Sequence, residues 1–152
     1  MGDLTSVDEI LDFAIQNEQS AVDLYTDLAK KIDRPEASAI FLEYADEERA
    51  HKAKLEKVKS GKTFLNSNEP VLDLNITYYS VEQQEIGDKP DHQAVLLYAM
   101  NLEKAAFKLY SDLAAKTDNE DVKDLFLGLA KEEAKHKLRF EVEYDQEILT
   151  HN

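Results

Sequence analysis

The feature of this sequence that most restricts its fold is an internal repeat. When the chain is shifted by 85 positions, residues 14–57 align with residues 99–142 without a gap, and 18 of the 44 aligned pairs are identical. The run LYTDLA at 24–29, for example, falls on LYSDLA at 109–114. Both copies are rich in Ala, Leu, Glu and Lys, which favour helices. We therefore predict two copies of one helical hairpin.

Each copy divides into two helices at a short polar segment. The runs DRPE at 33–36 and DNED at 118–121 are typical of an N-cap aspartate followed by an acidic first turn. Pro35 is tolerated there because the first amides of a helix have no helical partner. We expect helices at 6–32, 34–60, 90–117 and 119–148.

The length and the spacing of these helices predict one domain covering residues 1–152. Repeat 1 takes about 6–60, a crossover takes 61–89, and repeat 2 takes about 90–148. A helix of about 27 residues is ~40 Å long, and the crossover can run back along it because extended chain covers ~3.3 Å per residue. The expected fold is an all-α four-helix bundle of two repeated hairpins, with the long crossover between the second and third helices.

Composition excludes several classes of function. A formal net charge of −14 argues against nucleic acids and anionic membrane surfaces, and it favours small cations. The absence of cysteine removes disulfides, thiolate metal sites, iron–sulfur clusters and thiol catalysis. No apolar run approaches the ~20 residues that span a bilayer, and the first residues lack the features of a signal peptide. We expect a soluble, cytoplasmic protein.

Polar residues interrupt the apolar seam of every predicted helix at its middle. The seams repeat apolar residues at steps of three and four, as buried helix faces do. Burial of an unpaired carboxylate in such a face costs roughly several kcal/mol of lost hydration free energy unless a positive charge lies close to it. The interrupting residues are Glu18 in the first helix, Glu48 and His51 in the second, Glu103 in the third, and Glu133 and His136 in the fourth.

These six residues are expected to lie in one layer. Glu18 and Glu48 are both fifteen residues from Asp33, and Glu103 and Glu133 are both fifteen from Asp118. Helices that fold back at those points place each pair at one height, ~22 Å from the turn. Carboxylates and imidazoles suit iron or manganese, and carboxylates supply the bridging oxygens that two ions need. We predict a site for two iron ions per chain, with manganese as a second possibility.

The paired Glu…Glu-x-x-His pattern, from Glu18 to His136, resembles the rubrerythrin branch of the ferritin-like diiron-carboxylate proteins. The resemblance covers most of the chain. It implies that Glu48 and Glu133 bridge two irons, that Glu18 and His51 complete one, and that Glu103 and His136 complete the other. It further implies an oxidoreductase of the oxidative-stress response that reduces hydrogen peroxide, in a homodimer.

Two departures from the family pattern bear on this expectation. Many rubrerythrins carry a rubredoxin-like domain with four cysteines, and its absence implies an external electron donor, either a rubredoxin-like protein or a flavoprotein. They also place a further glutamate where this chain has Ala106. The symmetric six-residue set is shared with ferroxidase centres of the bacterioferritin type, so iron or oxygen handling remains an alternative. A metal-free interaction bundle, with the glutamates facing solvent, is a second alternative.

Two further sets of residues are left open at this point. Tyr25 and Tyr110 lie seven residues after Glu18 and Glu103, and they either fill the core or contact the ligand carboxylates. Four alanines near the predicted layer would leave room for a small oxidant. They are Ala14, Ala21, Ala99 and Ala106.

Overall fold

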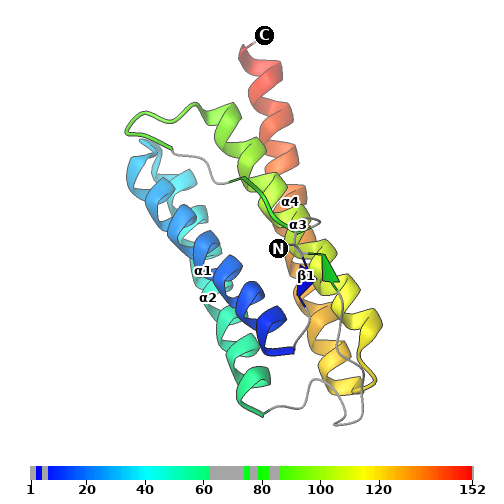
Figure 1. Ribbon diagram of the computed structural model, residues 1–152. Helices are drawn as coiled ribbons and strands as arrows, with labels where there is room; N and C mark the ends of the chain where they lie inside the picture. The colour runs from blue at the N-terminus through cyan, green and yellow to red at the C-terminus, as the bar shows by residue number, and fades with distance from the viewer. Residues whose placement is uncertain (1–2, 5–6, 62–73, 76–78, 83–85, 152) are drawn as a thin grey trace.

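The computed structural model describes residues 3–4, 7–61, 74–75, 79–82 and 86–151 (Figure 1). Its elements are β1 (Asp3–Leu4), α1 (Val7–Lys31), α2 (Pro35–Gly61), β2 (Leu74–Asn75), α3 (His92–Lys116) and α4 (Glu120–His151). The four described helices match the predicted ranges to within three residues at every end. The all-α four-helix bundle is therefore confirmed, with one small addition: β1 pairs antiparallel with β2.

The starts of the helices differ in detail from the prediction. Asn119, and not Asp118, caps α4, because its side-chain oxygen accepts hydrogen bonds from the amides of Asp121 and Val122 at 3.0 and 3.2 Å. Helix α2 begins at Pro35, so Arg34 and not Asp33 stands immediately before it. Both predicted caps were wrong by one residue. In the run DNED at 118–121, the neighbouring Asx residues do not reveal which one faces the first turn.

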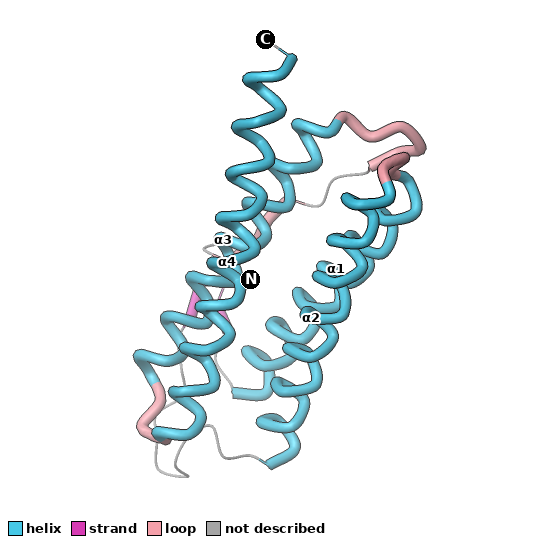
Figure 2. Tube along the Cα trace, turned by 180° about the vertical axis from the view of Figure 1, so that it is seen from behind, coloured by secondary structure: helices cyan, strands magenta, loops and turns pink. Residues whose placement is uncertain are grey.

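The helices form two antiparallel hairpins, α1 with α2 and α3 with α4 (Figure 1). The chain leaves α2 at one end of the bundle and enters α3 at the other end, so the connection traverses the bundle's length. Helix α4 extends past its neighbours toward the C-terminus in both views (Figure 2). No described helix combines the length and the apolar character needed to cross a bilayer.

Two apolar clusters fill the bundle on either side of a polar layer. The first, cluster A, is mainly aliphatic. The second, cluster B, is rich in aromatic rings, among them Tyr25, Phe41, Tyr44 and Phe140. The largest fully buried members of cluster A are Ile10, Leu11, Leu55, Leu109, Tyr110, Leu113 and Phe126. Burial of this much apolar surface fixes the helix faces, and with them the residues that lie between the clusters.

Candidate metal centre

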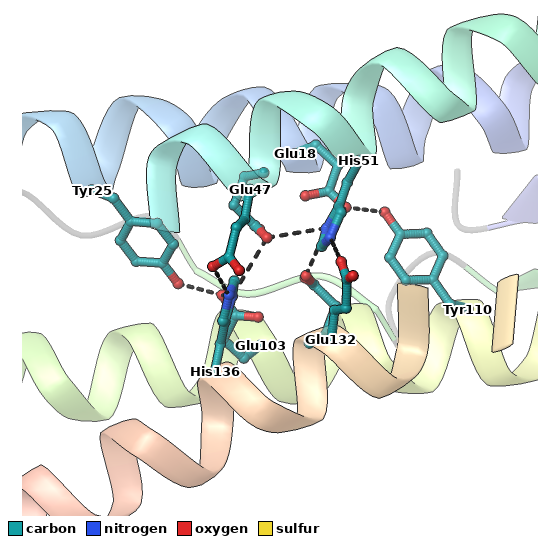
Figure 3. A network of polar contacts seen from close by, with 10 residues as sticks. Glu18, Tyr25, Glu47, His51, Glu103, Tyr110, Glu132 and His136 are labelled. Carbon is teal, nitrogen blue, oxygen red and sulfur yellow. Dashed lines mark hydrogen bonds and ion pairs between the residues drawn. The ribbon is translucent and has the colours of Figure 1, made fainter. Parts of the chain in front are cut away.

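All six residues that interrupt the predicted seams lie in the buried layer between the clusters. Their exposed fractions run from 0 to 4 %. They come from four helices: Glu18 from α1, Glu48 and His51 from α2, Glu103 from α3, and Glu133 and His136 from α4. The structure therefore brings together the whole predicted set, at the common height expected from the helix spacing (Figure 3).

The six residues form two groups of four that share two members. Glu18, Glu48, His51 and Glu133 offer ligand atoms that all lie within 4.8 Å of one another, and so do Glu48, Glu103, Glu133 and His136. Around His51, the Nδ1 atom lies 2.9 Å from Glu133 Oε1, 3.2 Å from Glu48 Oε1 and 3.5 Å from Glu18 Oε2. Glu48 and Glu133 belong to both groups, which is the position that bridging ligands require.

The buried polar atoms of the layer are suited to bind cations. Seven buried side-chain atoms lack a hydrogen-bond partner among the described residues, and one of them is Thr26 Oγ1. The other six comprise one atom from each member of the set: Glu18 Oε1, Glu48 Oε1, His51 Nδ1, Glu103 Oε2, Glu133 Oε1 and His136 Nδ1. Buried polar atoms in native proteins are normally satisfied. Oxygen and imidazole nitrogen acceptors directed at a shared space fit metal ions with oxygen and nitrogen ligands, such as iron or manganese.

Two further glutamates hold the histidines from outside, and sequence reasoning missed them. His136 Nε2 lies 2.8 Å from Glu47 Oε2, and His51 Nε2 contacts Glu132 Oε2 in the same way (Figure 3). Each contact crosses between α2 and α4. An outer carboxylate of this kind fixes the ring orientation and leaves the other nitrogen, here Nδ1, free for a metal. The signal was available in the sequence, since both repeats read Glu-Glu-x-x-His and only the second glutamate had been considered.

The two tyrosines left open by the sequence both pack in the core and contact the candidate ligands. Tyr25 on α1 donates its hydroxyl proton to Glu103 Oε1 on α3, and Tyr110 on α3 donates to Glu18 Oε2 on α1 (Figure 3). Burial, and then the charge of the contacted glutamate, raises the pKa of both phenols well above the ordinary value. Both tyrosines therefore remain hydrogen-bond donors to the layer at neutral pH.

Charge within the layer depends on protons when metal is absent. Burial lowers the pKa of His51, but the carboxylates of Glu18 and Glu48 outweigh it and raise this pKa to about 11. The same balance, with Glu103 and Glu48, raises the pKa of His136 to about 9. Burial also raises the pKa of Glu48 and Glu133, and neighbouring carboxylates raise it further. Cations that enter the layer must displace these protons.

A cavity of about 610 Å³ connects the layer with the surface between α1 and α3. Its inner wall includes Glu18 and Glu103, which are buried, and its outer wall includes Ser20 and Gly87, which are exposed. Two of the four predicted alanines, Ala21 and Ala106, line it. The other two, Ala14 and Ala99, are fully buried within clusters A and B and do not line this cavity.

Comparisons with known proteins agree with the fold. The family model described as rubrerythrin matches residues 9–144. A protein from Thermotoga maritima, described as a ferritin-like diiron-carboxylate protein, has a similar structure with a TM-score of 0.81 at 22 % identity, covering 97 % of this chain and 99 % of its own. A hypothetical protein from Pyrococcus furiosus gives a TM-score of 0.71 at 26 % identity, covering 92 % and 89 %. No curated protein matches the chain.

Proposed function

The chain belongs to the rubrerythrin family, and on that premise we propose that it is a diiron redox protein that reduces hydrogen peroxide. One observation carries the proposal: six buried oxygen and nitrogen atoms, one from each of the six layer residues, face one another and have no hydrogen-bond partner among the described residues. Four carboxylates in an apolar bundle would destabilise it strongly unless cations balance them. Two irons have the charge and the ligand preference for this place.

The two overlapping groups of four residues suggest how two irons would be held. Glu18 and His51 would hold one, Glu103 and His136 the other, and Glu48 and Glu133 would lie between them. Iron bound there would supply the two electrons that reduction of a peroxide bond to water requires. Glu132 would orient His51, and Glu47 would orient His136, so that the Nδ1 atom of each ring faces the metal site.

The tyrosines and the surrounding clusters control protons and water. Tyr25 Oη and Tyr110 Oη hold protons directly against the carboxylates of Glu103 and Glu18, which keeps those carboxylates in a fixed orientation. Clusters A and B exclude water above and below the layer, which strengthens every electrostatic contact inside it. A small oxidant would approach through the cavity between α1 and α3.

Electrons would come from a separate protein. The chain contains no cysteine, so it offers no four-cysteine iron site of its own. A rubredoxin-like protein or a flavoprotein as the donor, and a homodimeric assembly, remain predictions from the family resemblance.

The test is stopped-flow absorbance of anaerobic protein loaded with two ferrous ions per chain and mixed separately with hydrogen peroxide and with oxygen. Faster oxidation by peroxide supports the proposal. If oxygen reacts as fast or faster, the peroxidase function is wrong and an oxidase or ferroxidase function replaces it. Ala106 is the specific observation in favour of that alternative, because it lines the cavity where related proteins place a further glutamate.

The metal-free alternative requires glutamates that face solvent, whereas the four layer glutamates are only 1–2 % exposed. Replacement of all four by Leu should reduce bound iron from two ions per chain to none. The quadruple variant should have a free energy of unfolding about 1–4 kcal/mol higher than that of the metal-free unaltered protein, because apolar side chains replace buried charges. Elemental analysis and urea unfolding measure the two effects. Glu43→Leu with Glu56→Leu, at exposed positions on α2, is the control and should retain both irons.

A further inference from the structure

The outward side of the α3–α4 hairpin exposes most of the large apolar side chains that the bundle leaves uncovered. Of the six exposed large apolar residues in the described part of the chain, five belong to this hairpin, with exposed fractions of 42–61 %. They are Leu97, Phe107, Leu127, Leu138 and Val142. Single exposed leucines are ordinary, but a group of them on one surface marks a place of interaction.

Helical geometry places four of these residues on one surface. At 3.6 residues per turn, Leu127 and Leu138 lie about 120–140° around α4 from Glu132, which faces α2. The side of α3 that faces α1 lines the cavity described above, and neither Leu97 nor Phe107 is part of that lining. All four therefore point away from the other hairpin. We call the surface that they form the α3–α4 face.

The first repeat shows that the fold does not need these side chains. The position equivalent to Leu97 is Asp12, and the position equivalent to Leu138 is Ala53. Only Leu127 has an exposed apolar counterpart, which is Leu42. Both hairpins pack around the same layer, so the additional apolar surface of the second hairpin has a cause other than packing of the bundle.

The α3–α4 face is also positively charged, although the chain as a whole has a formal net charge of −14. Lys104, Lys131 and Lys135 are exposed on it, and none of them has an ion-pair partner among the described residues. Nearby cations do have such partners on their own helices, namely Lys108, Lys137 and Arg139. The equivalents of the three free lysines in the first repeat carry no positive charge: they are Gln19, Asp46 and Ala50.

The centre of the face lies over the metal layer. Lys104 directly follows Glu103 on α3, and Lys135 follows Glu133 by two residues on α4. The two glutamates point inward from the same helices whose outer sides form the face. A helix with its side chains is about 10–12 Å across, so one helix separates a molecule on this face from the layer.

The charge of the face selects its partner. A symmetric contact between two copies of the chain through this face would bring Lys104, Lys131 and Lys135 of one copy against those of the other, which like charges oppose. A partner with surface carboxylates would be attracted to the three lysines and could cover the leucines between them. The face thus fits an acidic protein better than a second copy of this chain.

We propose that the α3–α4 face is the docking site for an acidic electron-carrier protein. The inference rests on the proposed diiron function, which needs an external donor because the chain has no cysteine. Two reduced one-electron carriers give up one electron each at this face, and the two ferric ions of the oxidised centre become ferrous. No bond forms or breaks, and the oxidised carrier then dissociates.

Binding is tested without electron transfer by loading the protein with zinc. Two acidic carriers serve as probes, a rubredoxin and a flavodoxin, both oxidised and titrated by calorimetry at low salt. At least one should bind with one molecule per chain, and its affinity should fall as salt is added, because salt screens the lysines. Failure of both carriers to bind overturns the proposal.

A matched pair of variants locates the binding surface. Leu127→Glu should weaken binding of the carrier about tenfold or more, because it places a negative charge in the middle of the contact. Leu42→Glu is the control at the equivalent position of the first repeat, where the exposed fraction is 49 % against 48 % for Leu127. The control should bind like the unaltered protein, and equal weakening in both variants would contradict the assignment.

Electron transfer is tested with iron-loaded protein that ferricyanide has oxidised, so that the measurement needs no peroxide. Lys131→Glu combined with Lys135→Glu should slow its reduction by the reduced carrier about tenfold at low salt. Lys30→Glu combined with Lys57→Glu changes the net charge equally at exposed positions of the first hairpin and should have little effect. Equal slowing in the two double variants would show an effect of net charge alone and would overturn the proposal.

Sedimentation of the same variants distinguishes a carrier from a second copy. If the unaltered chain is a dimer that Leu127→Glu dissociates and Leu42→Glu does not, the face is covered by another copy and the proposal is wrong. A stopped-flow test in which oxygen outruns peroxide would remove the peroxidase function and leave carrier binding intact. Loss of carrier binding would likewise leave the peroxide result standing.

Discussion

His51 and His136 occupy equivalent positions in the two repeats, but their neighbours differ. The ring of His136 stacks with Tyr44 at a centroid distance of 4.0 Å and an interplanar angle of 23°. The position equivalent to Tyr44 in the other repeat is Leu129, in aliphatic cluster A. The pKa of His51 is about 11 and that of His136 about 9 in this setting. Equivalent candidate ligands thus lie in unequal surroundings, and the two proposed metal positions should differ in affinity.

The difference between the two halves should have its largest effect on how metal affinity changes with pH. In the metal-free protein both imidazoles hold a proton below pH 9, because their pKa values are raised to about 11 and about 9. Metal binding at Nδ1 releases that proton, so affinity should rise about tenfold per pH unit for each proton released. The metal affinity of the half with His136 should stop rising near pH 9, whereas the affinity of the half with His51 should continue to rise above pH 9. Calorimetric titration with zinc in two buffers counts the protons, and no release would contradict the expectation.

The outer glutamates should act in a crossed manner. Glu47→Ala removes the contact to His136, and Glu132→Ala removes the contact to His51, so each variant on one hairpin should weaken the metal position of the other. Loss of such a partner typically lowers affinity about 10–100-fold. Competition with a chelator measures it, and Glu43→Ala on the exposed face of α2 is the control. Equal weakening of both positions by each variant would argue against the crossed arrangement.

The tyrosines give a smaller effect on stability. Tyr25→Phe and Tyr110→Phe each leave one buried carboxylate without its hydroxyl donor, which should cost about 1–3 kcal/mol in unfolding free energy. Urea unfolding of the metal-free proteins measures the cost. A Tyr98→Phe variant at the edge of cluster B serves as the control, because no contact of its hydroxyl with the layer is present among the described hydrogen bonds. If Tyr25→Phe and Tyr110→Phe unfold like the unaltered protein, the two hydroxyl contacts contribute nothing.

The smallest effect should come from the residue that distinguishes the two halves. Tyr44→Leu gives His136 the neighbour that the other repeat has, and it removes a stacking contact of about 0.5–1.5 kcal/mol. The affinities of the two metal positions should then move closer together in a zinc titration. Leu129→Tyr is the reciprocal variant, and a wider gap after Tyr44→Leu would show that the stacked ring is not the cause of the difference.

The architecture and the six layer residues followed from the sequence because helical geometry is regular. A residue's face and height are given by its distance from the turn, so Glu18 and Glu103 could be placed without coordinates. The outer contacts were not accessible in this way. Whether Glu47 meets His136 depends on how closely α2 approaches α4, and that distance is set by packing of the clusters. The crossed contacts of Tyr25 and Tyr110 likewise follow from the antiparallel approach of α1 and α3. Most of the predicted crossover at 61–89 lies outside the described part of the chain, namely residues 62–73, 76–78 and 83–85.

The crossed contacts also bear on how such a centre can arise. Each hairpin carries a tyrosine that donates to the other hairpin and a glutamate that accepts from it, as Tyr25 with Glu103 and Tyr110 with Glu18 show. Two identical hairpins related by a twofold rotation would complete every one of these contacts without being joined. When the two hairpins are parts of one chain, each copy can change its sequence independently of the other. Substitutions such as Tyr44 against Leu129 can then accumulate in one half alone, which would give the two proposed metal positions separate chemical environments.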